Sequence, residues 1–185
     1  MLNIKWLLAS GFALSLATQS ALADFYVRGT GGLSTPDEDE LDNALGMSAQ
    51  AGYQINKYFA VQGGATYLGS FGFEEELEVE GLDEEGTMSI YGAEATLVAS
   101  GPVSEKFSLY GKAGIFAWEF EAEITASSGN TEFSETETID GTDAAYGIGG
   151  EYMLSPRLSI IGEANFYDID VADVNYFGGG VKFTF

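Results

Sequence analysis

The residues that could do chemistry in this sequence are nearly all carboxylates. Its 185 residues include 29 Asp and Glu but only seven Lys and Arg, and neither His nor Cys is present. Any mechanism that uses an imidazole as base is therefore excluded, and no disulfide can form. Carboxylate pairs such as Asp37 and Asp39 remain conceivable acid–base groups, but no activated nucleophile accompanies them. We predict no catalytic residues and no cofactor.

The same acids are also candidate cation ligands. The segment "PDEDELD" (36–42) places acids close together, but it lacks the central Gly of a helix–loop–helix calcium site. We therefore expect diffuse attraction of divalent cations and no specific metal site. Nucleic acid is excluded as a partner because the acidic segments repel phosphates.

A second set of charged residues lies on alternating positions of strand-like segments. It contains three cations and three anions: Arg28, Glu94, Lys112, Glu151, Glu163 and Lys182. Polar residues and Gly lie on the same side of each predicted strand as these charges, which we call the same phase. The residues between them form the opposite phase, which is apolar and carries no charge. A soluble sheet would bury the apolar phase, and a membrane barrel would enclose the polar one. Inside an eight-stranded barrel such charges must be paired, so we favour an interior charge network.

The elements that would position these residues have a period of two and are rich in Gly, aromatic and β-branched residues. Their lengths are close to the ~9–11 residues that a tilted strand needs to cross a bilayer. We predict eight strands, near 25–33, 44–55, 58–69, 87–99, 107–118, 143–154, 157–167 and 175–185.

The connections alternate between long and short. Short turns lie at 55–58, 100–106 and 154–157, and the long segments, with Asp143 counted at the end of the third, hold 24 of the 29 acids and no Lys or Arg. This order is typical of an outer-membrane barrel with both termini in the periplasm. The alternation continues into the second and third long segments, so those hairpins are expected to project as extended strands. Aromatic residues gather at both ends of the predicted strands, as membrane interfaces select.

The first 23 residues have the pattern of an export signal. Lys5 precedes an apolar run, and the segment ends with the small-x-small sequence Ala21-Leu22-Ala23. We predict a cleaved signal peptide over 1–23 and a barrel over 24–185.

Four stretches carry a family resemblance: "GYQINKYFAVQGGATY" (52–67), "FSLYGKAGIF" (107–116), "YGIGGEYMLSPRLSIIGEANFY" (146–167) and "FGGGVKFTF" (177–185). The chain resembles the small outer-membrane β-barrels of the OmpA/OmpX type. The resemblance implies an all-β, eight-stranded, antiparallel up-and-down transmembrane barrel with a polar plugged interior and long acidic extracellular loops. It also implies that the interior Glu and Lys or Arg side chains plug the barrel.

The end of the chain gains a role from the same resemblance. Phe185, with Phe183, would be the signal that the outer-membrane assembly machinery reads. No peptidoglycan-binding domain follows Phe185 in this sequence, so the expectation is a barrel alone, located in the bacterial outer membrane.

The predicted function is that of a non-enzymatic integral outer-membrane protein with a structural or surface-interaction role, in adhesion or envelope stabilisation, through its acidic loops. Exposed strand edges can pair with a partner, but rows of Glu also protect edges against pairing, and a merely solvated anionic face is the alternative. A narrow pore or gated channel and a His-independent barrel enzyme acting on lipid remain open. Expected partners are outer-membrane lipid, lipopolysaccharide and a surface protein, and the chain is expected to be a monomer.

Overall fold

The chain folds into one closed antiparallel barrel of eight strands in sequence order, β1 to β8. The computed structural model describes residues 25–37, 42–74, 83–128, 131–169 and 173–185, so the predicted signal peptide lies outside the described residues. The strands are β1 (Phe25–Pro36), β2 (Ala44–Gln54), β3 (Phe59–Glu74), β4 (Asp83–Pro102), β5 (Phe107–Ser128), β6 (Thr131–Ser155), β7 (Leu158–Asp168) and β8 (Val174–Thr184). The predicted eight-stranded all-β barrel is confirmed. No helix in these described ranges is long and apolar enough to cross a membrane.

The barrel closes where β8 pairs with β1. The register runs from Tyr26 opposite Thr184 to Pro36 opposite Val174. A Cβ added at Gly180 would collide with the backbone oxygen of Gly29, so this seam requires a residue without a side chain at that position. Among the three glycines of the last strand, Gly180 therefore allows close approach of the two backbones.

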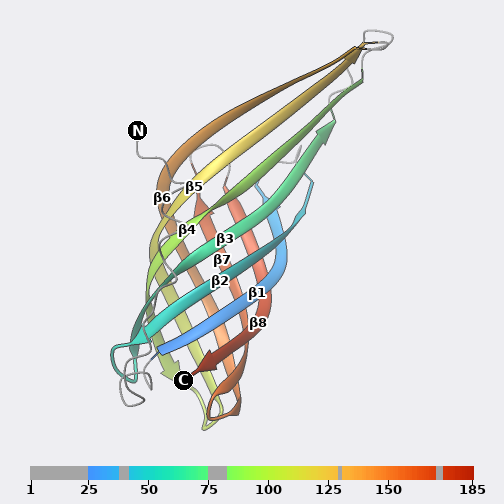
Figure 1. Cartoon of the computed structure of the whole chain (residues 1–185). Helices are drawn as coiled ribbons and strands as arrows, with labels where there is room; N and C mark the ends of the chain where they lie inside the picture. Colours follow the sequence, from blue (N-terminus) through green and yellow to red (C-terminus); the bar gives the residue numbers. More distant parts are fainter. Residues whose placement is uncertain (1–24, 38–41, 75–82, 129–130, 170–172) are drawn as a thin grey trace.

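Four strands are much longer than the predicted bilayer-spanning lengths. β1, β2, β7 and β8 have 11 or 12 residues, whereas β3 to β6 have 16 to 25. Pairing of β5 with β6 continues to Ser128 opposite Thr131. In Figure 1 these strands rise together beyond the others, away from the C-terminus. We call the part of β3–β6 beyond the closed barrel the projecting sheet; its hairpins extend as the alternation of the sequence predicts.

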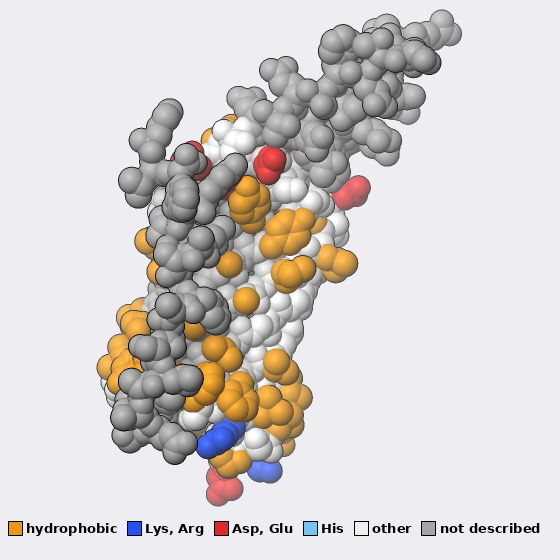
Figure 2. Space-filling model, viewed as in Figure 1, with side chains coloured by type: hydrophobic (Ala, Val, Ile, Leu, Met, Phe, Trp, Pro, Cys, Tyr) orange, Lys and Arg blue, Asp and Glu red, His pale blue; other side chains and the backbone are white. Residues whose placement is uncertain are grey.

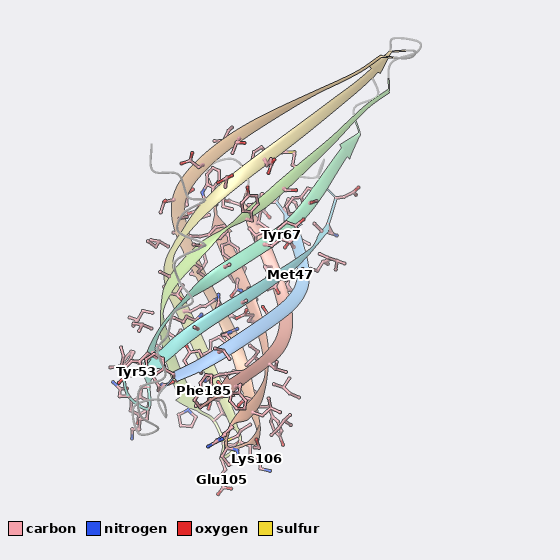
Figure 3. The ribbon with its side chains drawn as sticks, viewed as in Figure 1. Met47, Tyr53, Tyr67, Glu105, Lys106 and Phe185 are labelled. Atoms are coloured by element: carbon pink, nitrogen blue, oxygen red, sulfur yellow. The ribbon has the colours of Figure 1, made fainter. Side chains whose placement is uncertain are left out.

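The outer face of the barrel is apolar. Large hydrophobic side chains on alternate positions are exposed, among them Met47, Ile115, Ile148 and Val181. Figure 2 shows hydrophobic side chains over the barrel wall, acids at the upper rim, and both cations and acid at the lower end. In Figure 3 Tyr53 and Phe185 lie near the lower end and Tyr67 near the upper part. This distribution fits a wall that contacts lipid.

The interior has two layers of different chemistry. Charged and polar side chains fill its middle, as the inward phase predicts. Towards the projecting sheet lies a second layer, the upper apolar layer, which the sequence pattern did not predict. Its larger members are Leu68, Phe71, Ile90, Phe116, Trp118, Phe120, Tyr167, Ile169, Val174 and Tyr176. A wholly polar interior is therefore an incomplete description, because several inward aromatics meet only when the barrel closes.

A bulge in β3 supplies part of this layer. The register with β4 shifts between Tyr67 and Gly69, which leaves Leu68 as an extra residue. Gly69 has a φ of 124°, a conformation that side-chain-bearing residues rarely adopt. The extra residue reverses the alternation, so that both Leu68 and Phe71 are fully buried. Without the bulge, Phe71 would face outwards.

Candidate functional site

The candidate site is a cluster of four charged side chains in the middle of the barrel. We call it the central cluster; it consists of Arg28 (β1), Glu94 (β4), Lys112 (β5) and Glu163 (β7). Arg28 Nη2 donates to Glu163 Oε2. Lys112 Nζ lies 2.9 Å from Glu94 Oε1 and 3.8 Å from Glu163 Oε2. Lys112 thus links two carboxylates, and the four charges sum to zero.

Hydroxyl groups complete the hydrogen bonding of both carboxylates. Tyr110 Oη donates to Glu163 Oε2 at 3.1 Å and accepts from Arg28 Nη2 at 3.2 Å. Tyr167 Oη donates to Glu94 Oε2 at 3.0 Å. Buried ions remain tolerable only when their remaining lone pairs are satisfied in this way. The cluster is therefore a rigid, neutral plug rather than a set of groups poised to exchange protons.

The other two predicted network residues form a separate contact, which we call the mouth pair. Lys182 Nζ lies 2.8 Å from Glu151 Oε2, and it also sits 4.5 Å from the centre of the Tyr26 ring. Lys182 is the register partner of Arg28 across the seam. These adjacent cations point to different acids, Arg28 to Glu163 and Lys182 to Glu151. The structure thus divides the six residues into a cluster of four and a pair.

The acids proposed for chemistry or cation binding lie around the long connections. Asp37 Oδ1 accepts a bond of 3.4 Å from Asn175 Nδ2, while Asp39 lies outside the described residues. Partial desolvation and the carboxylate of Asp168 raise the pKa of Asp173. In the part of the chain that the structure describes, no group of three or more acids has the geometry of a metal site.

Phe183 and Phe185 lie at the end of β8, on the lower part of the barrel. Their rings meet edge to face with centres 5.4 Å apart, and both side chains are exposed. The backbone N–H of Phe185 donates to the carbonyl of Phe25 at 3.1 Å, so the last residue is held against the first strand.

Sequence reasoning missed one contributor to the central cluster. Tyr167 is buried, donates to Glu94 and stacks at a tilt on Phe116, with ring centres 4.9 Å apart. Tyr167 lies on the same side of β7 as Glu163 and Asn165. This alternation was the sequence signal that could have predicted its inward position.

Comparisons with known proteins agree with this architecture. The model of the outer membrane protein beta-barrel domain matches residues 6–185. Among curated relatives, outer membrane protein A of Escherichia fergusonii is 25% identical over 137 residues, which cover 74% of this chain and 36% of that protein. The Shigella flexneri protein of the same name is 23% identical over 137 residues, with the same coverage of 74% and 36%. The aligned part thus spans about a third of the length of these relatives.

Solved structures show the same fold at low sequence identity. OprG of Pseudomonas aeruginosa superposes with a TM-score of 0.61 at 15% identity and covers 88% of this chain and 97% of its own. Ail of Yersinia pestis, solved with the heparin analogue sucrose octasulfate, gives a TM-score of 0.58 at 23% identity and covers 87% and 96%. The closed barrel, its apolar wall and the family match together establish that this chain belongs to the outer membrane protein beta-barrel family and is a protein of the bacterial outer membrane.

Proposed function

We propose that this protein is a non-enzymatic surface-interaction protein that binds a cationic partner through its projecting sheet. The observation that carries the proposal is the edge of β6. Pairing with β7 stops at Ala144 opposite Asp168, while pairing with β5 continues from Thr142 to Thr131. Residues 131–142 therefore form an edge that no other described strand covers. An edge of this kind can accept an added strand.

The charge of this edge selects the partner. Glu132, Glu135, Glu137 and Asp140 lie on this segment, which contains no Lys or Arg. Rows of acids oppose pairing with another acidic strand, including a second copy of the same edge. They attract a basic strand and raise its rate of association. The heparin analogue in the Ail structure is polyanionic, so the charge here supports a different ligand class despite the shared fold.

Adhesion of bacteria that display the protein tests this role. The variant E132Q/E135Q/E137Q/D140N neutralises the β6 edge, and D37N/D42N/D168N/D173N removes four charges from other long segments. We expect the first variant to reduce adhesion to cultured cells and immobilised matrix severalfold, and the second to leave it nearly unchanged. Equal adhesion by wild type and the edge variant would contradict the proposal.

A pore is the alternative function, and the filled interior of the barrel argues against it. The central cluster and the upper apolar layer lie one above the other across the lumen. An eight-stranded barrel is narrow enough to be filled by such side chains. We expect no large, stable conductance steps from the purified protein in planar bilayers; their appearance would favour the channel.

The remaining partners belong to the same proposal. The apolar wall would contact membrane lipid and lipopolysaccharide, and the protein would act as a monomer because closure leaves no unpaired edge within the barrel wall. Phe185, with Phe183, would present the assembly signal. F185A should lower the fraction of protein inserted into the outer membrane, as judged by heat-modifiable migration on gels, whereas the outward I160A serves as a control for lost apolar area.

A further inference from the structure

A cavity of about 220 Å³ opens at the lower end of the barrel, where the short turns lie. Its lining residues come from every strand except β7 and from the β2–β3 turn. We propose that this cavity binds a small organic oxyanion, a carboxylate or phosphate that carries a ring or a short aliphatic body. The site is at the opposite end of the molecule from the projecting sheet, and its function would be independent of surface binding.

The cavity has a cationic lining in an otherwise acidic protein. Arg28, Lys57 and Lys182 line it, and among the described residues Glu151 is its only lining acid. Glu151 pairs with Lys182. Lys57 has no ion pair with any described residue; its Nζ lies 4.7 Å from the centre of the Tyr58 ring. The mouth of the cavity therefore keeps a positive charge that its own lining does not neutralise.

Arg28 lines the cavity and carries one buried donor without a partner. Arg28 is only 7% exposed, and its Nη2 donates hydrogen bonds to Glu163 and Tyr110. Its Nε is buried and has no hydrogen-bond partner among the described residues. A buried charged N–H without a partner is unfavourable. An oxyanion in the cavity would meet the Arg28 guanidinium charge, and a turn of the side chain towards the cavity would let Nε donate a charge-assisted bond to it.

One wall of the cavity is apolar. Tyr26, Ala60, Val98 and Tyr110 form a small buried cluster, and all four also line the cavity. The space is many times that required for one water molecule. A ring or short chain could pack on this wall while its anionic group meets the cations. The apolar wall therefore favours an organic anion over an inorganic one.

The acids at the far end do not cancel this local attraction. The long segments that hold most acids lie beyond strands of 11 residues or more, which corresponds to about 35 Å of strand length. This separation is several times the Debye length of about 8 Å at physiological ionic strength. An anion at the cavity mouth would respond mainly to the local charges, which are Lys57, the Lys182–Glu151 pair and the Arg28–Glu163 pair.

Nuclear magnetic resonance of the arginine side chains tests the site directly. Beyond residue 23 the chain has two arginines, Arg28 and Arg157, so the Nε–Hε spectrum of the mature barrel contains two signals. We expect benzoate, added to protein in zwitterionic nanodiscs, to shift the Arg28 signal saturably and leave the exposed Arg157 signal nearly unchanged. Inorganic phosphate should bind at least threefold more weakly, because it cannot use the apolar wall.

A second arm identifies the source of the oxyanion. In nanodiscs that contain phosphatidylglycerol, a displaced Arg28 signal and weaker benzoate binding would support a lipid headgroup as occupant. An unchanged signal with full benzoate affinity would support a free solute. Absence of a selective Arg28 shift with benzoate, phosphate and phosphatidylglycerol alike would overturn the proposal.

Matched variants separate a defined site from general attraction. Lys57 lines the cavity, whereas Lys106, in the next short turn, does not. We expect K57Q to weaken benzoate binding about threefold and K106Q to change it less than twofold. S108E, which adds a carboxylate to the lining, should weaken binding at least tenfold. Equal effects of K57Q and K106Q would contradict a defined site, and this pair remains informative even if S108E does not fold.

Discussion

The central cluster and the mouth pair contain the same kinds of ion pair in different surroundings. The Lys112–Glu94 and Lys182–Glu151 contacts measure 2.9 and 2.8 Å. The side chains of the first contact are 2% and 1% exposed, whereas those of the second are 17% and 24% exposed. Water screens the mouth pair and can solvate either member alone, but it cannot do so for the central cluster. The N–O distance alone therefore does not show how much each ion pair contributes to the stability of the barrel.

Charge has two different uses inside this barrel. In the central cluster, carboxylates are bridged by Lys112 and capped by tyrosine hydroxyls. At the mouth, Lys182 and Glu151 line an open cavity. The first arrangement closes the lumen and the second leaves charge accessible to a ligand.

The largest expected effect comes from removing one member of the central cluster. E163Q leaves Arg28 buried without its carboxylate, and we expect a loss of about 3–5 kcal/mol in the free energy of unfolding. Reversible urea unfolding in lipid vesicles, followed by Trp118 fluorescence, measures it. E151Q at the mouth is the matched control. Similar losses in both variants would remove the distinction between the two regions.

Removing both charges of a central contact should cost less than removing one. R28M/E163Q leaves the Lys112–Glu94 contact in place and no uncompensated Arg, so we expect about 2 kcal/mol less destabilisation than in E163Q. The same unfolding experiment, arranged as a double-mutant cycle with R28M, gives the coupling. Simple additivity would show that desolvated charge is not the source of the loss.

The mouth pair should contribute less. K182A removes a partly exposed ion pair and a contact with the Tyr26 ring, so we expect a loss of about 0.5–1 kcal/mol. High salt should reduce this difference but not the effect of E163Q. A loss of unfolding free energy as large as that of E163Q would indicate that water does not screen the Lys182–Glu151 pair.

The smallest effect concerns like charges at the open rim. Because the pKa of Asp173 is raised in the folded protein, its ionisation disfavours folding, and this penalty develops as pH rises above the ordinary value of 3.8. D173N should therefore stabilise the barrel slightly at pH 7 and have no effect at pH 3. Unfolding curves at both pH values check the sign. Destabilisation at pH 7 would mean that Asp173 is held by a favourable contact instead.

Local sequence pattern predicted the barrel because alternation is a local property. Apolar residues on one phase and charges on the other define two faces, as for Val181 and Lys182 on β8. The export-type first segment and the order of long and short connections then favour the apolar face as the one that meets lipid. The predicted strand ends were less accurate. They followed the edge of the apolar band, whereas backbone pairing continues into polar segments such as 131–142.

The upper apolar layer shows where local pattern fails. The orientation of Phe71 depends on the bulge at Leu68 and Gly69, and the bulge is a property of the pairing of β3 with β4. The sequence does contain Gly69, but a glycine inside a strand signals a bulge only weakly.

The sequence by itself determined the fold class, the lipid-facing phase and the balanced set of six inward charges, because these depend on residue type and parity along single strands, on the export-type first segment and on the order of the connections. Only the tertiary structure decided that Arg28 pairs with Glu163 while its neighbour Lys182 pairs with Glu151. It also decided that aromatic side chains fill the upper interior and that a cationic cavity remains below. These features depend on strand stagger and barrel closure, which bring together side chains far apart in sequence.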